Sequence, residues 1–426
     1  MTEPYRVIVI GAGNRGKTYA DLMLSLPEKF KVVAVAEPID DRRNYFAKTF
    51  NIPEENCCKD WQTLLAKGKI ADVAVIATMD RDHFAPATKA INLGYHLLLE
   101  KPISPLPSES IRLAQLAREK NVHVLVCHVL RFTPFFVRMK QLIDDDAVGE
   151  VQSIIHSEFV GNVHQSHSFV RGNWGNSEKS SPMILQKSCH DMDILQWLVG
   201  RECKYVQSFG SLSYFCAKNK PEGAADRCID CKVRDDCPYN AIPLYPAEEG
   251  WFPSAASKKI VPTQEDIDRV LAETDYGRCV FSCDNNVVDH QVVNLEFEGG
   301  LTVAFTMAAF NKGGREIRIM GTKGELTARM SDDHMQLYRF DTKETTEVPI
   351  EDAHAGDNIS NGHGGGDEGI VNALYSLLSG TYHGNNICDA MRSAENHIIA
   401  YAAEESRRTH KTIDMDEFRR EIFANL

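Results

Sequence analysis

One short stretch near the start of the chain limits the possible folds more than any other feature. Residues 6–10 read Arg-Val-Ile-Val-Ile, a β-branched run typical of a buried strand. Gly11, Gly13 and Gly16 follow at once with the spacing G-x-G-x-x-G, and a helical pattern over 17–26 comes next. The first glycine permits a tight turn, the second lets the backbone approach a pyrophosphate, and the third lets the helix pack against the strand. This order predicts a dinucleotide-binding Rossmann unit, with the phosphates at the helix N-terminus.

The end of the second strand indicates which dinucleotide is bound. An apolar strand over 31–36 ends in Glu37, 21 residues after Gly16. A carboxylate there accepts hydrogen bonds from the adenosine ribose and repels a 2′-phosphate, which favours NAD over NADP. Arg42 and Arg43 follow, and they either neutralise a 2′-phosphate or form a solvated helix start. The other residues expected at the cofactor are Asn14, Arg15, Thr78, His83, Glu100 and Lys101.

Strands and helices alternate as far as residue 130 or so. Further strands are predicted at 72–77, 95–99 and 122–127, with helices at 83–92 and 108–120. This alternation is typical of parallel βαβ units. We therefore expect an α/β Rossmann domain over residues 1–130.

The pattern changes in the second part of the chain. Residues 151–159 alternate apolar and polar side chains, as a half-exposed antiparallel strand does. More strand patterns follow at 291–297, 301–309, 316–320 and 335–340, and helices are predicted at 369–378 and 388–408. We expect residues 131–426 to form an α+β domain with a largely antiparallel open sheet. Its last helices are expected to pack back on the Rossmann domain.

A Cys-rich insertion, at about 212–275, interrupts this second domain. Its central part, 216–265, is rich in Pro, Cys and charged residues, and is predicted to have little regular structure and too few apolar residues to hold itself together.

Composition excludes several classes of partner. The net charge of −13 argues against nucleic-acid binding, which needs a basic face. No stretch reaches the ~18–20 apolar residues that cross a bilayer, and the first residues have no signal-peptide pattern. We expect a cytoplasmic protein with a small-molecule substrate and with neither a nucleic-acid nor a membrane partner.

Three motifs together resemble a known enzyme family. The glycine motif comes first, Glu100-Lys101-Pro102 follows a later strand, and Cys189-His190-Asp191-Met192-Asp193 begins a helix. Their order and spacing, over nearly the whole chain, resemble the Gfo/Idh/MocA oxidoreductases, named for glucose-fructose oxidoreductase, inositol dehydrogenase and a rhizopine-catabolism protein.

The resemblance implies catalytic roles for two of these residues. It places Lys101 near the nicotinamide and the substrate hydroxyl, in proton transfer or orientation, and makes His190 the catalytic histidine. A desolvated lysine and a near-neutral imidazole suit removal of a hydroxyl proton. From the residues alone, Lys101 could instead form an ion pair with Glu100, and His190 could be a helix-capping or core residue.

The sequence departs from the family pattern just before His190. Many sugar dehydrogenases of the family carry Asp four residues earlier, where this chain has Gln186. Lys187 comes next and is a candidate second cation in catalysis. Asp193, one helical turn after His190, is expected to hydrogen bond to it, whereas Asp191 is a candidate substrate ligand.

Two loops carry further candidates for the substrate side. Arg171-Gly-Asn-Trp174 offers donors and an aromatic platform, although a surface loop with a packed Trp is an equal alternative. In His363-Gly-Gly-Gly-Asp367, glycines either let the backbone reach a ligand or enter an N-capped helix. The predicted substrate residues are Arg171, Trp174, Asp191 and His363.

Cysteines in the insertion have the spacing of a metal site. Cys228, Cys231 and Cys237 form C-x2-C-x5-C, and Cys216 is upstream. With Cys216, Cys283 or a histidine as the fourth ligand, they could close a structural zinc site; the alternative is reduced thiols.

The predicted function is NAD(P)-dependent hydride transfer between a CH–OH group of a sugar, cyclitol or sugar derivative and nicotinamide. One alternative is an NAD-dependent glycosidase that oxidises C3 transiently and eliminates the aglycone. The second is a non-catalytic sensor of NAD or a sugar, against which Lys101 and His190 argue. The resemblance also implies a homo-oligomer, either a dimer or a tetramer.

Overall fold

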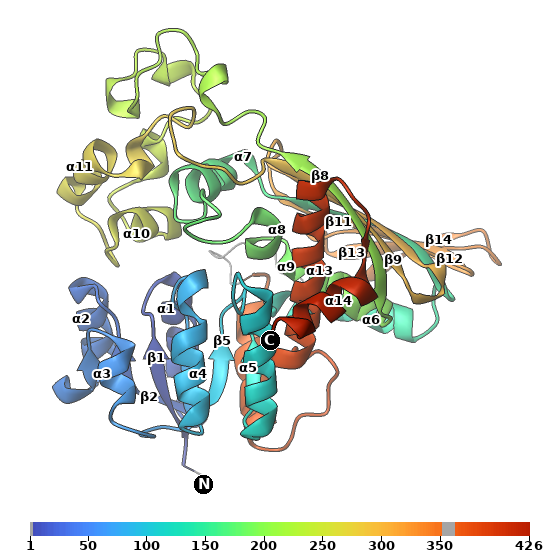
Figure 1. Ribbon diagram of the computed structural model, residues 1–426, viewed down its shortest axis with the longest axis horizontal. Coiled ribbons are helices and arrows are strands. Elements are labelled where there is room, and N and C mark those ends of the chain that lie inside the picture. The colour runs from blue at the N-terminus through green and yellow to red at the C-terminus, as the bar shows by residue number, and fades with distance from the viewer. Residues whose placement is uncertain (1–2, 352–362) are drawn as a thin grey trace.

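A six-stranded parallel sheet forms the N-terminal domain, in the order β3-β2-β1-β4-β5-β6 (Figure 1). The computed structural model describes residues 3–351 and 363–426. Helices cover both faces of the sheet, so its central strands are buried and apolar on both sides. This strand order is that of the Rossmann fold and confirms the prediction. The strands are β1 Tyr5–Ile10, β2 Phe30–Ala36, β3 Cys57–Cys58, β4 Val73–Ile76, β5 His96–Leu99 and β6 Val124–Val126, and the helices are α1 Asn14–Leu24, α2 Asp40–Thr49, α3 Trp61–Leu65, α4 Phe84–Asn92 and α5 Pro107–Glu119.

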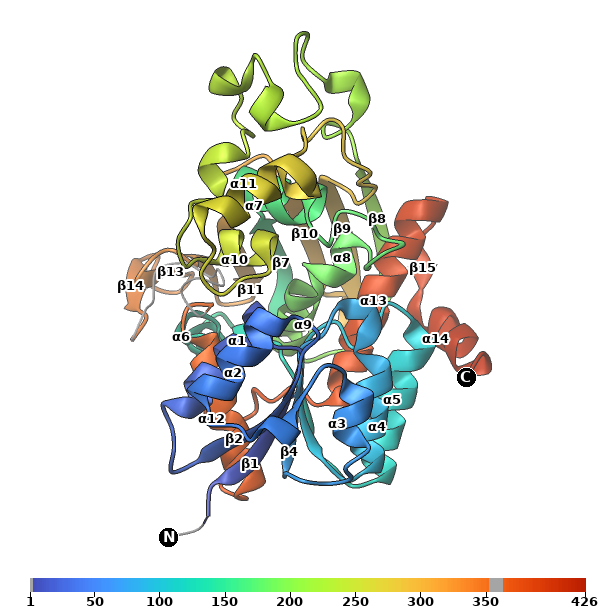
Figure 2. The same cartoon turned by 90° about the vertical axis from the view of Figure 1, so that its left-hand side faces the viewer.

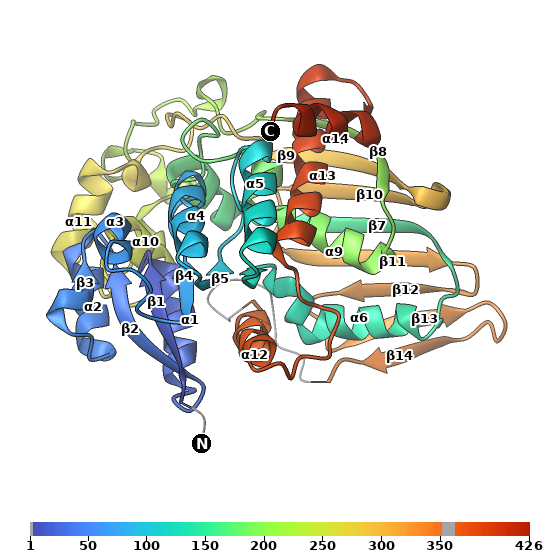
Figure 3. The same ribbon diagram turned by 60° about the horizontal axis from the view of Figure 1, so that its bottom comes forward.

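A nine-stranded sheet forms most of the C-terminal domain, in the order β14-β13-β12-β11-β7-β10-β9-β8-β15. Among the strand pairs described in this sheet, only β7–β10 is parallel, so the predicted largely antiparallel sheet is confirmed. Helices lie across one face of this sheet, and the other face is open (Figure 3). The strands are β7 Val151–Phe159, β8 Cys203–Ser211, β9 His290–Phe297, β10 Thr302–Ala308, β11 Gly314–Gly321, β12 Gly324–Arg329, β13 His334–Arg339, β14 Thr345–Pro349 and β15 Ile413–Asp414, and the helices before β8 are α6 Pro134–Asp144, α7 Asn162–His164, α8 Met183–Gln186 and α9 Cys189–Val199.

Helices from the end of the chain complete the core of the first domain. Ile370 and Leu374 of α12 (Gly366–Leu378) join the apolar cluster on one face of the parallel sheet. Ala390 and Ala394 of α13 (Ala390–Thr409) join the cluster on the opposite face. A further helix, α14 (Met415–Ala424), follows. Within the described ranges, no helix combines the length and the apolar character needed to cross a membrane.

The insertion between β8 and β9 has more regular structure than its composition predicts. It contains α10 (Trp251–Ser257) and α11 (Gln264–Glu273), and α10 lies above α1 of the nucleotide domain (Figure 2). Thr263 and Asp266 cap α11 reciprocally, and Ile267 packs in a small apolar cluster with Tyr245. The expectation that the insertion lacks a hydrophobic interior is therefore wrong.

Candidate active site

The glycine motif forms a tight crossing between β1 and α1. Gly11 has a φ of +89°, and a Cβ there would lie 2.5 Å from the carbonyl oxygen of Ala77. A Cβ on Gly16 would lie 2.0 Å from the carbonyl oxygen of Gly11. A Cβ on Gly13 would instead meet only the Arg42 guanidinium, at 3.5 Å. The backbone at Gly13, where α1 begins, is thus open to a ligand, and it fits the pyrophosphate of a dinucleotide.

Glu37 is built into the same loop. It is 4% exposed, and its carboxylate accepts hydrogen bonds from the backbone N–H groups of Ala12 at 2.7 Å and Ile39 at 2.9 Å. The two arginines after it have different partners. Arg43 donates to the Glu37 carbonyl oxygen and pairs with Asp40, whereas Arg42 lies beside Gly13. Glu37 therefore holds the loop while its negative charge stays beside the nucleotide site.

A cavity of about 300 Å³ lies over the glycine loop and is roofed by the insertion. Asn14 Nδ2 donates to the carbonyl oxygen of Trp251 at 3.5 Å, and an Arg42 guanidinium nitrogen donates to that of Ser254 at 3.4 Å. The N–H of Ile260 donates to the Asp41 carboxylate at 3.0 Å. The segment 249–260 thus closes the nucleotide site from the second domain.

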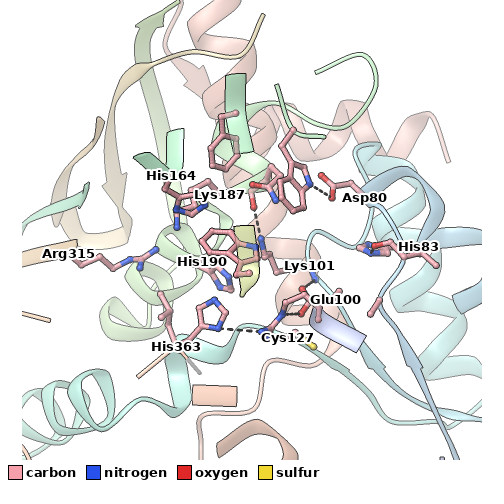
Figure 4. Close-up of a pocket in the computed structure, with 18 residues that line it drawn as sticks. Asp80, His83, Glu100, Lys101, Cys127, His164, Lys187, His190, Arg315 and His363 are labelled. Atoms are coloured by element: carbon pink, nitrogen blue, oxygen red, sulfur yellow. Dashed lines mark hydrogen bonds and ion pairs between the residues drawn. The ribbon is translucent and has the colours of Figure 1, made fainter. Parts of the chain in front are cut away.

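A second cavity, of about 120 Å³, lies at the carboxyl ends of the parallel strands, where open α/β sheets bind ligands. Thr78 follows β4, Glu100 and Lys101 follow β5, and Cys127 follows β6. His83 also lines this cavity and is held by the carbonyl oxygens of Pro102 and Thr78. From the other domain come Phe169, Trp174, Gln186, Lys187, His190, Trp251, Arg315, His363 and His164 (Figure 4).

Lys101 is held across the cavity by the second domain. Its Nζ donates to the backbone carbonyl oxygen of Gln186 at 2.7 Å. Glu100 pairs instead with Arg15, at 2.7 Å, so the alternative ion pair between Glu100 and Lys101 is not formed. An ammonium group has three donors, which leaves two on Lys101 for a ligand. Gln186, which stands where many relatives carry Asp, thus orients Lys101 through its backbone.

His190 presents a neutral imidazole to the same cavity. It is 7% exposed, and neither ring nitrogen hydrogen bonds to another residue in the described part of the chain. Burial, and then the charge of Lys101, lower the pKa of His190 well below its usual range. The expected hydrogen bond from Asp193 is absent, since that carboxylate binds the Arg131 guanidinium at 2.7 and 2.8 Å. The ring is therefore free to accept a proton from a ligand.

Buried carboxylates form ion pairs with the cations that line the cavity. Lys187 Nζ lies 3.2 Å from the Glu158 carboxylate, which also pairs with Arg315 at 2.5 Å. Arg315 in turn binds Asp191 at 2.8 Å, and Asp191 accepts from His156 Nε2 at 2.8 Å. Asp191 is fully buried in this network, so the prediction that it contacts the substrate is wrong. It positions Arg315, which does line the cavity.

Each of the two predicted substrate loops contributes one residue to the cavity. Trp174 lines the cavity, and its Nε1 donates to the buried Asp80 at 3.2 Å. His363 also lines it and contacts Asp367 at 3.0 Å. Arg171 does not: it is 3% exposed and binds the carbonyl oxygens of Arg278 and Tyr239, so its predicted substrate role is wrong.

Cys216 lies apart from the other predicted metal ligands. Its Sγ lies against the carbonyl oxygens of Ser213 and Tyr214. Cys228, Cys231 and Cys237 line a separate cavity that Cys216 does not reach. Cys216 is therefore not the fourth ligand of that group.

Arg315, Trp251 and Asp80 line the cavity although they were not among the predicted site residues. For Arg315 a signal exists, because in β11 it faces the same way as the buried Ile317 and Ile319. A charged residue in phase with core residues marks a buried polar site. Trp251 and Asp80 carry no comparable local signal.

Comparison with known proteins agrees with this architecture. Residues 5–128 match a family model described as "Oxidoreductase family, NAD-binding Rossmann fold", and residues 140–414 match "Oxidoreductase family, C-terminal alpha/beta domain". The Bacillus subtilis protein YteT is 23% identical over 71% of this chain and 72% of its own length. Inositol 2-dehydrogenase of Corynebacterium glutamicum strain R is 24% identical over 49% of this chain and 58% of its own length.

Solved structures share the fold over nearly the whole chain. An oxidoreductase from Agrobacterium radiobacter, in complex with NAD+, L-tartaric acid and magnesium, superimposes with a TM-score of 0.67 at 15% identity, covering 98% of this chain and 99% of that one. Aldose-aldose oxidoreductase from Caulobacter crescentus gives 0.66 at 13% identity, covering 96% and 99%. With both domains matched in order, the chain belongs to the Gfo/Idh/MocA family of oxidoreductases.

Proposed function

We propose that this oxidoreductase transfers hydride between a CH–OH carbon of a sugar, cyclitol or sugar derivative and the nicotinamide of NAD. The observation that carries the proposal is the convergence of Lys101 and His190 on one cavity beside the glycine loop. A lysine ammonium and a neutral histidine with no hydrogen-bond partner among the described residues suit removal of a hydroxyl proton. The inositol dehydrogenase among the relatives supports a polyol substrate.

Residues of the substrate cavity have separate roles in the proposed hydride transfer. Lys101, fixed by the Gln186 carbonyl oxygen, donates to the substrate oxygen and stabilises the negative charge that develops there. His190 accepts the hydroxyl proton, because its depressed pKa keeps the imidazole neutral at neutral pH. Bound NAD supplies the hydride acceptor. Lys187, Trp174 and His363 orient the remaining hydroxyl groups.

We infer a preference for NAD over NADP from Glu37. A 2′-phosphate on the adenosine ribose would lie beside a buried carboxylate that already satisfies two backbone N–H groups. Arg42, the cation nearest to Gly13, opposes this preference only in part, because it also binds the insertion.

The test is an assay with NAD and a panel of free sugars, inositols and aryl glycosides. Steady growth of NADH absorbance on a free polyol supports the proposal. Release of the aglycone without net NADH identifies the redox glycosidase instead. Tight NAD binding with no turnover on any member of the panel contradicts both and indicates a sensor.

We also propose a homo-oligomer that forms through the open face of the nine-stranded sheet. Ile155, Phe209 and Val292 project from this face and are 40–49% exposed. An apolar surface of this kind is typical of subunit contacts. Light scattering coupled to size exclusion would show a dimer or tetramer that Ile155→Arg disrupts; a monomeric wild type contradicts the proposal.

A further inference from the structure

Four cysteines from three parts of the insertion face one small cavity. Cys228, Cys231, Cys237 and Cys279 line a space of about 20 Å³. That volume holds one water-sized body and is too small for a polynuclear iron–sulfur cluster. The described lining residues of this cavity include none of those that line the nucleotide or substrate cavities.

The chain fold explains how these cysteines meet. Cys228 begins one short 3-10 turn, Cys231 directly follows it, and Cys237 directly follows the next such turn. Cys279 comes from much later in the sequence. An antiparallel bridge between Arg227 and Arg278 brings it alongside, and the Cys279 N–H donates to the Asp226 carbonyl oxygen at 2.8 Å.

A buried positive charge beside the cavity is the second observation. Arg171 is 3% exposed, and among the described residues no carboxylate lies within 4.0 Å of its guanidinium. Its Nη2 lies 3.6 Å from Cys228 Sγ, and its buried Nη1 has no hydrogen-bond partner within residues 3–351 and 363–426. A buried guanidinium is costly unless an anion balances it. The groups at hand that can supply an anion are the cysteine sulfurs, as thiolates.

We propose that this cavity binds one structural zinc ion through Cys228, Cys231, Cys237 and Cys279. Four thiolates around Zn²⁺ leave a net charge of −2, which Arg171 partly balances. The N–H of Ala241 donates to Cys228 Sγ at 3.4 Å, as backbone amides do to metal-bound thiolates. Four protein ligands fill the coordination sphere of the zinc ion. The ion therefore holds the segments of the insertion together and takes no part in hydride transfer.

Zinc binding has to draw the sulfur atoms together. Zinc–sulfur bonds of about 2.3 Å put the sulfur atoms of a tetrahedral site roughly 3.8 Å apart. In the described part of the chain, no three of these sulfur atoms lie within 4.8 Å of one another. The cysteine side chains therefore turn inward as the ion enters, and the displaced thiol protons pass to solvent.

The primary test is metal analysis of protein purified without chelator or a metal-affinity tag. We expect one zinc per chain in the wild type, less than a tenth of that in Cys279→Ser, and an unchanged amount in Cys216→Ser, the matched control. Zinc retained in Cys279→Ser, iron in place of zinc, or wild type without stoichiometric metal would each overturn the proposal.

A second measurement covers the case in which Cys279→Ser does not fold. Titrating intact wild type with a mercurial reagent should release one zinc as four thiols react, and Co²⁺ exchange should give the visible absorption of a tetrahedral thiolate site. Zinc release that does not follow thiol modification, or a disulfide between any two of the four cysteines, contradicts the site. Neither readout uses a substrate, so the result is independent of the enzymatic proposal.

Discussion

At the residue scale, Lys101 is the side chain on which the proposed reaction depends most. Replacing it with Met keeps the length and removes the charge that faces the substrate oxygen. We expect kcat/KM to fall by roughly 10²–10⁴-fold, the range for loss of a charge-stabilising or proton-transferring group. Steady-state kinetics on the best polyol would measure this.

The control for that variant is Lys179→Met, which removes a lysine that is 67% exposed and pairs with Asp284 at the surface. It should keep full activity. If Lys101→Met kept more than a tenth of the wild-type kcat/KM, the role assigned to Lys101 would be wrong.

Glu37 allows a second prediction at this scale. Glu37→Gln keeps an acceptor for the Ala12 N–H and removes the charge that repels a 2′-phosphate. We expect the ratio of kcat/KM with NAD to that with NADP to fall at least about tenfold, or about 1.4 kcal/mol. The comparison needs both nucleotides and Glu28→Gln, an exposed acid, as the control. An unchanged ratio would remove the argument for NAD.

Sequence patterns located the residues whose roles are local. Gly11, Gly13 and Gly16 act on the backbone of their own loop, so their spacing was enough to place them. Arg171 was misassigned because its partners, the carbonyl oxygens of Arg278 and Tyr239, come from other segments of the insertion. Periodicity within one segment cannot show such contacts.

At the scale of elements, α10 is the part of the insertion that reaches the cofactor. Trp251 lines the nucleotide cavity and the substrate cavity alike, and its ring meets that of His164 at 4.8 Å between centroids. The cysteine spacing drew attention to the insertion, but its contact with α1 depends on tertiary packing that the sequence does not reveal.

Trp251→Ala should therefore weaken nucleotide binding. Without the ring, water would reach the nucleotide cavity from the side that α10 covers. We therefore expect the Kd for NADH to rise roughly tenfold, equivalent to about 1.4 kcal/mol. Calorimetric titration or nucleotide fluorescence would measure the Kd. Val261→Ala, an exposed position just after the segment 249–260, is the control. Equal affinity in Trp251→Ala and wild type would show that α10 does not cover the cofactor.

At the scale of the whole molecule, buried histidines make stability depend on pH. Burial lowers the pKa of His128 to about 4 and those of His167 and His397 to about 3, against 6.5 for a free histidine. The unfolded chain therefore binds protons before the folded one does. The stability from these groups is present above pH 6.5 and is lost as the pH falls, toward 4 for His128 and toward 3 for His167 and His397, by up to about 1.4 kcal/mol per pH unit for each group.

We expect the midpoint of thermal unfolding to fall by several degrees between pH 7.5 and pH 5.0. Differential scanning calorimetry across this range would measure it. His167→Phe should have a shallower pH dependence than wild type, whereas the exposed His410→Gln should match wild type. A midpoint that stays constant down to pH 5.0 would contradict the assignment of these histidines as neutral.

The two domains were predictable because each repeats a local pattern: alternating strands and helices, then alternating apolar and polar residues. How they join was harder to predict. Arg15, in the glycine motif, forms a partly buried ion pair with Asp367 of α12 at 2.6 Å, across 352 positions of sequence. No local signal in either segment identifies the other.

The position of α12 has a consequence for how the protein is made. Strands β1–β6 of the nucleotide domain lie within residues 5–126 and are translated well before α12, yet Ile370 and Leu374 belong to the core of that domain. During synthesis, the part of the parallel sheet's face that α12 covers, beside α1 and α2, therefore stays exposed while most of the chain is still being translated. The nascent protein has to shield an apolar sheet surface until α12 emerges, and a chain that stops before α12 would expose that surface to chaperones and proteases.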